Sequence, residues 1–207
     1  MSYYRENQMI RHFPNLQELH QGMKFAVILF LAASSCVSSL AHNQAHQKGV
    51  GQLAEVGSVC VFMDTGCPIA RYHTRTLRLL HEEYAGKGIR FTAIFPAANI
   101  TEKSLQAYVE KYKFPLKAIL DPGQARARAL KATIVPEVFV FDQNEKLIYR
   151  GRIDDRFAAV GKRRPLTRTH DLADVLRALS ASETIEPRKT KAIGCAITFR
   201  QKDTTRE

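Results

Sequence analysis

The stretch VGSVCVFMDTGCPIA, residues 56–70, decides the fold of this chain. Residues 56–63 form a short and nearly continuous apolar run, which is typical of a strand that is buried on both faces of a sheet. Gly66 then allows a tight turn, and Pro68 opens a helix, because a proline at the first helical position loses no hydrogen bond. The stretch therefore predicts a strand that leads directly into a helix, with Cys67 at the turn between them.

Strand and helix signals alternate from this turn to residue 180. Apolar residues recur at helical spacing after Pro68 until the glycines at 86 and 88 stop the helix, and a polar turn separates two short apolar runs in a hairpin pattern. Residues 151–168 show no clear period and are expected to form a long loop. The other expected elements are strands at 89–95, 117–120, 138–141 and 147–149, and helices at 101–112, 124–131 and 170–180.

The order of these elements indicates an α/β fold. Parallel strand–helix–strand units that lead into a terminal hairpin predict a mixed central sheet with helices on both faces. With 207 residues, of which 45% are hydrophobic and 25% charged, the chain suits one globular domain with extensions. We assign this domain to residues 53–183, preceded by a linker at 42–52 and followed by a C-terminal tail at 184–207.

Residues 1–41 are typical of a leader that ends in a secretory signal. Lys24 precedes the apolar run at 25–31, and small residues follow up to Ala41, after which we expect cleavage. The run is shorter than the roughly 20 apolar residues that span a bilayer, so no stable membrane span is predicted. The mature domain is expected in the periplasm or outside the cell. The alternatives are a lipoprotein anchored through Cys36 and a buried N-terminal helix.

Several stretches resemble the thioredoxin-like superfamily. Within it they are similar to exported bacterial redoxin-domain proteins, the branch of alkyl-hydroperoxide-reductase and thiol-specific-antioxidant proteins and of thiol–disulfide oxidoreductases. The element order, the cysteine at the first strand-to-helix turn and the proline that opens the hairpin carry this resemblance. The helix and strand near 101–120 resemble the redoxin-type insertion. The similar stretches are CPIA (67–70), PEVFV (136–140), YRGRIDD (149–155) and IGC (193–195), within about 53–197.

The resemblance implies a thioredoxin fold in which a cis proline, here Pro136, faces the reactive cysteine and shapes a substrate groove. The alternative is a trans proline at a strand start, since cis bonds are only about 5–6% of prolyl bonds in folded proteins. Glu137 could relay protons or could be a simple carboxylate at the strand edge. The implied substrate-binding residues are Thr65, Gly66, Pro68, Val135, Pro136 and Glu137.

Cys67 is the predicted nucleophile. The thiolate is the reactive form of cysteine, and the free amides and positive dipole end at a helix N-terminus stabilise it. We expect Cys67 at an exposed turn, and the alternative is an inert buried cysteine. Arg71 adds positive potential or is a solvated surface arginine. Cys60 lies mid-strand among apolar residues and is assigned to the core.

Two departures from the similar families limit the reaction. Ala70 stands where thioredoxins place their second cysteine, so a resolving thiol cannot come from the motif itself. Cys60 and Asp64 stand where peroxiredoxins carry proline and threonine, so peroxide reduction is not indicated. Cys195 in the tail is then a candidate catalytic or structural partner of Cys67, and the alternative is a free or intermolecular thiol.

The sequence thus predicts an exported thiol–disulfide oxidoreductase that acts on the thiols or disulfides of exported proteins. Cys195 or an external thiol reductant resolves the mixed disulfide. The alternatives are a thiol peroxidase that reduces peroxide and a redox-silent binding module on the same scaffold.

No cofactor, metal or nucleic acid is expected. His42, His46 and Cys67 lack the spacing of metal ligands, and no glycine-rich phosphate loop is present. The formal net charge is +11, with a cluster of basic residues at 150–170. This cluster lacks interleaved aromatic residues, so a solvated loop that pairs with its own aspartates is favoured over a surface that steers anionic partners.

Overall fold

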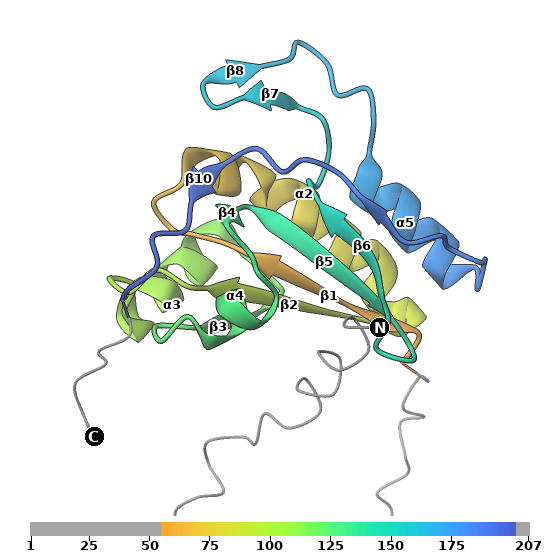
Figure 1. The fold of residues 1–207 in the computed structure, drawn as a ribbon, viewed down its shortest axis with the longest axis horizontal. Coiled ribbons are helices and arrows are strands. Elements are labelled where there is room, and N and C mark those ends of the chain that lie inside the picture. Colours follow the sequence, from red (N-terminus) through yellow and green to blue (C-terminus); the bar gives the residue numbers. More distant parts are fainter. Residues whose placement is uncertain (1–54, 202–207) are drawn as a thin grey trace, which may run out of the picture. The chain divides into compact units, whose positions relative to one another are not determined.

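The structure, a computed structural model, describes residues 55–201 (Figure 1). The predicted leader at 1–41 and linker at 42–52, with Cys36, His42 and His46, lie outside the described residues. The elements in chain order are β1 (Gly57–Phe62), α2 (Pro68–Tyr84), η3 (Ala85–Lys87), β2 (Ile89–Phe95), α3 (Glu102–Tyr112), β3 (Lys117–Leu120), α4 (Ala125–Ala129), β4 (Ile134–Val135), β5 (Glu137–Asp142), β6 (Leu147–Gly151), β7 (Phe157–Ala159), β8 (Lys162–Arg163), α5 (Asp171–Ser180), β9 (Arg188–Lys189) and β10 (Cys195–Ala196).

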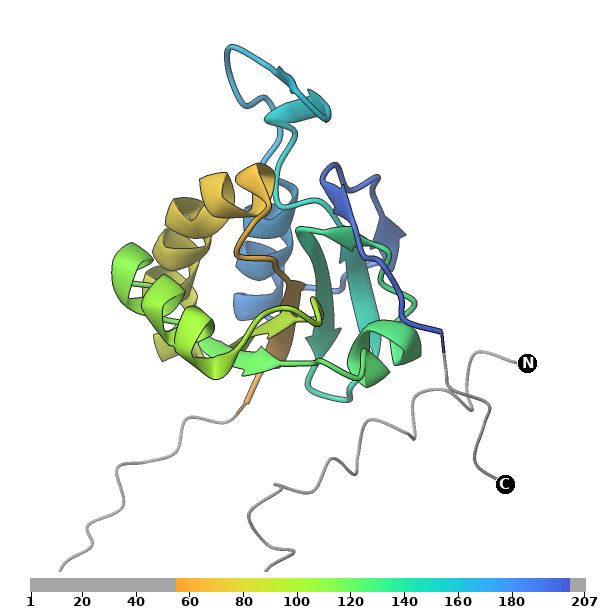
Figure 2. The same cartoon turned by 90° about the vertical axis from the view of Figure 1, so that its left-hand side faces the viewer.

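A six-stranded mixed sheet lies at the centre, in the order β3–β2–β1–β5–β6–β9. β1, β2 and β3 run parallel to one another, whereas β5 is antiparallel to both β1 and β6. Figure 2 shows α2, α3 and α5 on one side of the sheet and α4 on the other. This arrangement is the mixed α/β, thioredoxin-like fold that the sequence predicts.

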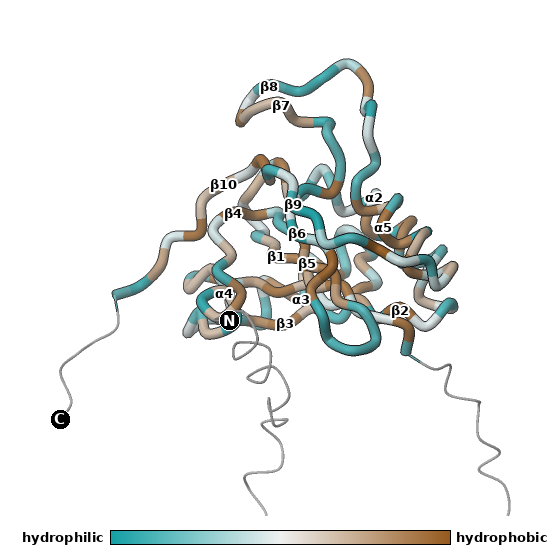
Figure 3. Tube along the Cα trace, turned by 45° about the vertical axis from the view of Figure 1, so that its right-hand side comes forward, coloured by the Kyte–Doolittle hydropathy of each residue, from teal (hydrophilic) through white to brown (hydrophobic). Residues whose placement is uncertain are grey.

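The core follows the apolar pattern of the sequence. Val59 and Val61 of β1 are fully buried, and hydrophobic residues concentrate on the central strands (Figure 3). The inner face of α5 is buried at all four predicted positions: Leu172, Val175, Leu176 and Leu179. α3 begins with a capping box, in which Thr101 Oγ1 accepts a hydrogen bond from the Ser104 amide and Ser104 Oγ accepts one from the Thr101 amide.

Residues 151–168 are not a single loop, contrary to the expectation from the sequence. β7 and β8 pair in antiparallel fashion and form a two-stranded ribbon that projects from the body of the molecule (Figure 1). Phe157 of the ribbon packs edge-to-face on Tyr72 and His73 of α2, with ring centroids 5.2 and 5.7 Å apart. These strands have two or three residues each, which is too short for a strand period to show in the sequence.

The residues after α5 cross the molecule and return to the sheet (Figure 1). β9 pairs in parallel with β6, and β10 pairs in antiparallel fashion with β4. We call residues 188–200 the strap.

The strap is held near its start by Thr190. The Thr190 hydroxyl shares a hydrogen bond of 2.6 Å with the Tyr149 hydroxyl and accepts one from the Arg152 amide at 3.1 Å. Gly151 makes room for this contact, because a Cβ there would overlap Thr190 Oγ1 and lie 2.9 Å from the Thr190 carbonyl carbon.

The far end of the strap is held by α4 and the residue before it. Gln124 Nε2 donates a hydrogen bond to the Thr198 carbonyl at 2.7 Å, and Gln124 Oε1 accepts one from the Arg200 amide at 2.8 Å. The Arg128 guanidinium lies over the Phe199 ring, 4.8 Å from its centroid. The strap is therefore tied to the domain at both ends.

Candidate active site

Cys67 lies at the N-cap of α2, with Pro68 at the first helical position. The preceding turn is closed by Asp64, whose Oδ1 accepts a hydrogen bond of 2.6 Å from the Gly66 amide. Gly66 and Pro68 are exposed and Thr65 is half-buried. Cys67 itself is only 3% exposed. The expectation of an exposed cysteine is therefore wrong, because the β4–β5 junction and the strap lie against its thiol.

The peptide bond between Val135 and Pro136 is cis, as the resemblance implied. Both residues are buried. The Cys67 thiol donates a hydrogen bond of 3.3 Å to the Val135 carbonyl oxygen, so the start of α2 and the start of the hairpin meet at this sulfur.

The strap brings the second predicted cysteine to the same point. Cys195 lies opposite Val135 in the β10–β4 pair, and its thiol donates to the Cys67 sulfur with 2.8 Å between the two Sγ atoms. Both residues are free thiols in this structure. Burial, together with the adjacent Cys67 and Asp64, raises the pKa of Cys195 to about 12, so Cys195 holds its proton at neutral pH.

Gly194 is the residue that permits this close approach. A Cβ at this position would overlap the carbonyl oxygen of Val135 and lie 2.7 Å from its carbonyl carbon. Any larger residue would therefore push the strap, and Cys195 with it, away from β4.

Glu137 is not a free strand-edge carboxylate. It is buried, its Oε1 accepts a hydrogen bond from Arg150 Nε at 2.7 Å, and its Oε2 accepts one from the Thr133 amide at 3.3 Å. Arg150 also donates to the carbonyls of Leu130 and Lys131. The pair thus ties the segment before β4 to β6, and it positions the cis-proline turn rather than offering an open oxygen to a substrate.

The Cys60 and Arg71 side chains make no hydrogen bond with the two sulfurs, although the Arg71 amide donates to the Cys67 carbonyl at 3.0 Å. Cys60 is half-buried in β1 beside Thr92 and Phe139 of the neighbouring strands, and burial raises the pKa of its thiol to about 11. Arg71 is exposed on the first turn of α2.

Residues 39–150 of the sequence match the AhpC/TSA family. The chain belongs to the AhpC/TSA family. No curated protein matches the sequence. The matched region ends at residue 150, so Cys195 and the whole strap of this AhpC/TSA protein lie outside it.

Solved structures resemble this AhpC/TSA protein in fold. An uncharacterized conserved protein from Geobacillus kaustophilus is 23% identical, with a TM-score of 0.64 over 73% of this chain and 81% of its own. A hypothetical protein from Sinorhizobium meliloti is 22% identical, with a TM-score of 0.61 over 72% and 82%. A secreted disulfide oxidoreductase from Mycobacterium tuberculosis is 14% identical, with a TM-score of 0.44 over 63% and 84%.

A cleft of about 360 Å³ opens beside the cysteine pair of this AhpC/TSA protein. Asp64 and Val135 border it next to the sulfurs, and the strap forms one wall. Sequence reasoning did not find this cleft, because its walls come from segments far apart in the chain. Its remaining lining residues are Pro96, Ala97, Ala98, Asn99, Gln124, Ala196, Ile197, Thr198 and Arg200.

Sequence reasoning also missed His73. It is buried on α2, its Nδ1 lies 3.7 Å from Asp154 Oδ2, and Nδ1 has no hydrogen-bond partner. Burial lowers the pKa of His73 more than the nearby Asp154 raises it, which keeps the imidazole neutral at pH 7. The signal was present in the sequence, because residue 73 shares a helical face with the buried residues at 69, 77, 80 and 84.

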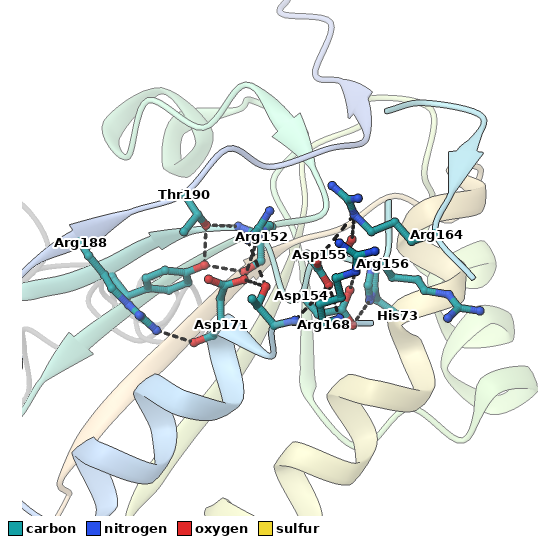
Figure 4. Close-up of polar contacts among 12 residues, drawn as sticks. His73, Arg152, Asp154, Asp155, Arg156, Arg164, Arg168, Asp171, Arg188 and Thr190 are labelled. Atoms are coloured by element: carbon teal, nitrogen blue, oxygen red, sulfur yellow. Dashed lines mark hydrogen bonds and ion pairs between the residues drawn. The ribbon is translucent and has the colours of Figure 1, made fainter. Parts of the chain in front are cut away.

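Two arginine side chains of the basic cluster at 150–170 pair with aspartates (Figure 4). Arg152 Nε donates to Asp171 Oδ2 at 2.8 Å, and Arg164 Nε lies 3.6 Å from Asp155 Oδ2. Hydrogen bonds from the amides of Arg168 and Thr169 lower the pKa of Asp155, which therefore stays ionised. These pairs support the interpretation of a solvated, self-paired segment.

Two further observations apply to residues 55–201 alone. No helix in this part of the chain is long and apolar enough to cross a bilayer. No group of three His, Cys, Asp or Glu side chains there is placed to hold a metal ion.

Proposed function

We propose that this chain is an exported thiol–disulfide oxidoreductase in which Cys67 is the nucleophile and Cys195 is the resolving thiol. The observation that carries the proposal is the 2.8 Å distance between the two sulfurs, across 128 residues of sequence. A disulfide has an S–S length of about 2.05 Å, so only a small movement separates this pair from a covalent bond.

The reaction begins at Cys67. Its thiolate attacks one sulfur of a disulfide in another exported protein, a new S–S bond forms, and the second substrate sulfur leaves as a thiolate that takes a proton from water. Cys195 then gives its proton to solvent and attacks Cys67 Sγ, which releases the first substrate sulfur. The substrate disulfide has become two thiols, and the chain holds a Cys67–Cys195 disulfide that an external thiol reductant returns to the reduced form.

The electrostatics of the pair support this order of events. After burial, the hydrogen bond to Cys67 and the charge of Cys67 are the main causes that hold the Cys195 proton in place. The charge of Cys67 disappears once Cys67 is part of a mixed disulfide, whereas burial and Asp64 still act on Cys195. Cys195 is therefore kept protonated while Cys67 waits for substrate, and it loses its proton more easily when resolution is needed.

A thiol peroxidase is the second candidate, and the match to the AhpC/TSA family favours it. Cys67 would attack a peroxide oxygen and become a sulfenic acid with release of an alcohol or water, and Cys195 would then form the disulfide with loss of water. Asp64 argues for disulfide exchange as the main activity, because a carboxylate offers no hydroxyl donor to a peroxide at the position where peroxiredoxins carry threonine.

The test compares Cys67→Ser, Cys195→Ser and Cys60→Ser variants in insulin reduction and in peroxide consumption. Cys67→Ser should abolish turnover, Cys195→Ser should trap substrate as a mixed disulfide on Cys67, and Cys60→Ser is the matched control that should behave as wild type. Peptide mapping of the oxidised wild type without reductant should show a Cys67–Cys195 linked peptide. Wild-type protein without either activity would instead support the redox-silent binding module.

A further inference from the structure

The strap lies in the place that an extended substrate would need. Among the strands of residues 55–201, β4 is paired only with β10, through Cys195 opposite Val135 and Ala196 opposite Ile134. The Ile197 amide extends this ladder by donating to the Thr133 carbonyl at 2.8 Å. If β10 leaves, the backbone groups of β4 lie unpaired beside Cys67, which is the condition for another extended segment to add as a strand.

The hydrogen bonds of the strap allow such an exchange. They are concentrated at its ends, at Thr190 and at Thr198 and Arg200, and between these ends the strap contacts the domain through the short β10–β4 pair. Cys195 is half-buried and Ala196 is exposed. The middle of the strap can therefore lift from β4 while both ends stay attached.

One position in the strap has a strict steric requirement. Gly194 passes so close to Val135 that a Cβ would overlap the Val135 carbonyl oxygen. That oxygen is also the one that the Cys67 thiol contacts, at 3.3 Å, so it belongs to the wall of the site whatever segment lies there. A substrate strand in the same register meets the same carbonyl at the residue before its reacting cysteine.

We propose that the strap is an internal copy of the substrate, and that the substrate is an extended protein segment in which glycine directly precedes the cysteine that reacts with Cys67. This inference rests on the proposed function and names its substrate class. The substrate segment replaces β10 on β4, and its sulfur takes the place of Cys195 Sγ. When the strap returns, Cys195 attacks Cys67 and expels the substrate sulfur, as in the reaction described above.

The test uses two capped pentapeptides, Ile-Gly-Cys-Ala-Ile and Ile-Val-Cys-Ala-Ile, each with its cysteine in a disulfide with 2-thiopyridine. They react with the full-length Cys36→Ser, Cys60→Ser, Cys195→Ser chain, in which Cys67 is the only cysteine left. Attack by Cys67 on the peptide sulfur releases 2-thiopyridone, which is followed by its absorbance. Each rate is divided by the rate at which the same peptide disulfide reacts with the amino acid cysteine in solution. This ratio removes the intrinsic reactivity of the peptide disulfide.

The glycine peptide should react about tenfold faster than the valine peptide, or more. Equal rates would overturn the inference. The small disulfide 2,2′-dithiodipyridine separates the two proposals. If it reacts at Cys67 while the peptides do not differ, only the substrate class is wrong, whereas no reaction at Cys67 with any of the three removes the proposed function as well.

A second variant tests the competition between strap and substrate. Gly194→Val, added to the same background, should undock β10 and raise the rate of the glycine peptide several-fold, while the preference over valine persists because Val135 is unchanged. Gly86→Val is the matched control, since Gly86 lies in η3 with no atom within 4 Å of an added Cβ. If the glycine peptide reacts with the Gly194→Val variant no faster than with the Gly86→Val variant, the strap does not occupy the site where the peptide binds.

Discussion

Cys60 and Cys67 lie seven residues apart and have different surroundings. Cys60 is held in the middle of β1, where burial raises its pKa to about 11 against the weaker opposing effect of Arg90 and Arg126. Cys67 lies at the N-cap of α2, with its thiol against the Val135 carbonyl and the Cys195 thiol. The same side chain is therefore a packing group at one position and a candidate nucleophile at the other.

This contrast predicts how the reduced protein reacts with iodoacetamide at pH 8. Cys60 should be modified about a hundredfold more slowly in the folded protein than in the unfolded chain, where a free cysteine has a pKa of about 8.5. Mass spectrometry of peptides from native and guanidinium-unfolded samples measures the two rates. Modification of native Cys60 at the rate of the unfolded chain would contradict the burial of its thiol.

The buried Glu137–Arg150 pair predicts a large stability difference between two arginines. Arg150→Met should lower the free energy of unfolding by about 3–5 kcal/mol, because it leaves the Glu137 carboxylate buried without its partner. Arg90→Met should cost about 1 kcal/mol or less, since Arg90 and Glu55 form an exposed pair. Urea unfolding of the reduced variants measures both. Equal losses would mean that Glu137 is solvated in solution.

The residues of the site could be predicted individually, but their contacts could not. The motif around Cys67 and the proline at 136 carry recognisable local patterns, whereas the position of Cys195 depends on two-residue strands that leave no period in the sequence. Nothing in the sequence distinguishes Gly194 from the other glycines of the chain, because its steric role depends on the Val135 carbonyl beside it. His73 could have been placed in the core from its helical spacing.

At the scale of elements, the length of each helix or strand decided whether the sequence could predict it. The strands expected at 89–95 and 117–120 coincide with β2 and β3, because short segments rich in apolar residues and bounded by glycine or proline indicate strands. α4 is shorter than the expected 124–131, since Gln124 has a left-handed backbone and lies before the helix. The ribbon and the strap were missed because their strands are stabilised by partners distant in sequence.

The packing of α2 against the ribbon predicts a pH dependence of stability. The pKa of His73 is lower in the folded protein than the unfolded value of about 6.5, so below that pH the unfolded chain binds a proton that the folded chain does not. Stability should therefore fall from pH 7.5 to 5.5, with a contribution from His73 of at most about 1.4 kcal/mol per pH unit.

His73→Gln removes this titration and should flatten the pH dependence of the free energy of unfolding in urea. His170→Gln is the control, because His170 is exposed at the start of α5 and loses little hydration on folding. A His73→Gln variant with the same slope as wild type would refute the assignment.

At the scale of the whole molecule, the proposed export predicts a shorter chain outside the cytoplasm. The mature protein should begin at His42, which N-terminal sequencing of the secreted or periplasmic fraction would detect. An Ala41→Arg variant should block this cleavage, whereas Ala45→Arg, beyond the expected site, should not. A soluble protein that keeps residues 1–41 would contradict the signal, and lipid on Cys36 would support the lipoprotein alternative.

The attachment of the strap at both ends has a kinetic consequence for the proposed reaction. A thiol that cannot diffuse away acts on its partner as an intramolecular reactant, with an effective concentration of about millimolar for a flexible tether and far more when the groups are aligned. Dissolved thiols at micromolar concentration then lose the competition for the mixed disulfide on Cys67. Each captured substrate is committed to release, and the chain gives up two electrons at a time as the Cys67 and Cys195 thiols close into a disulfide.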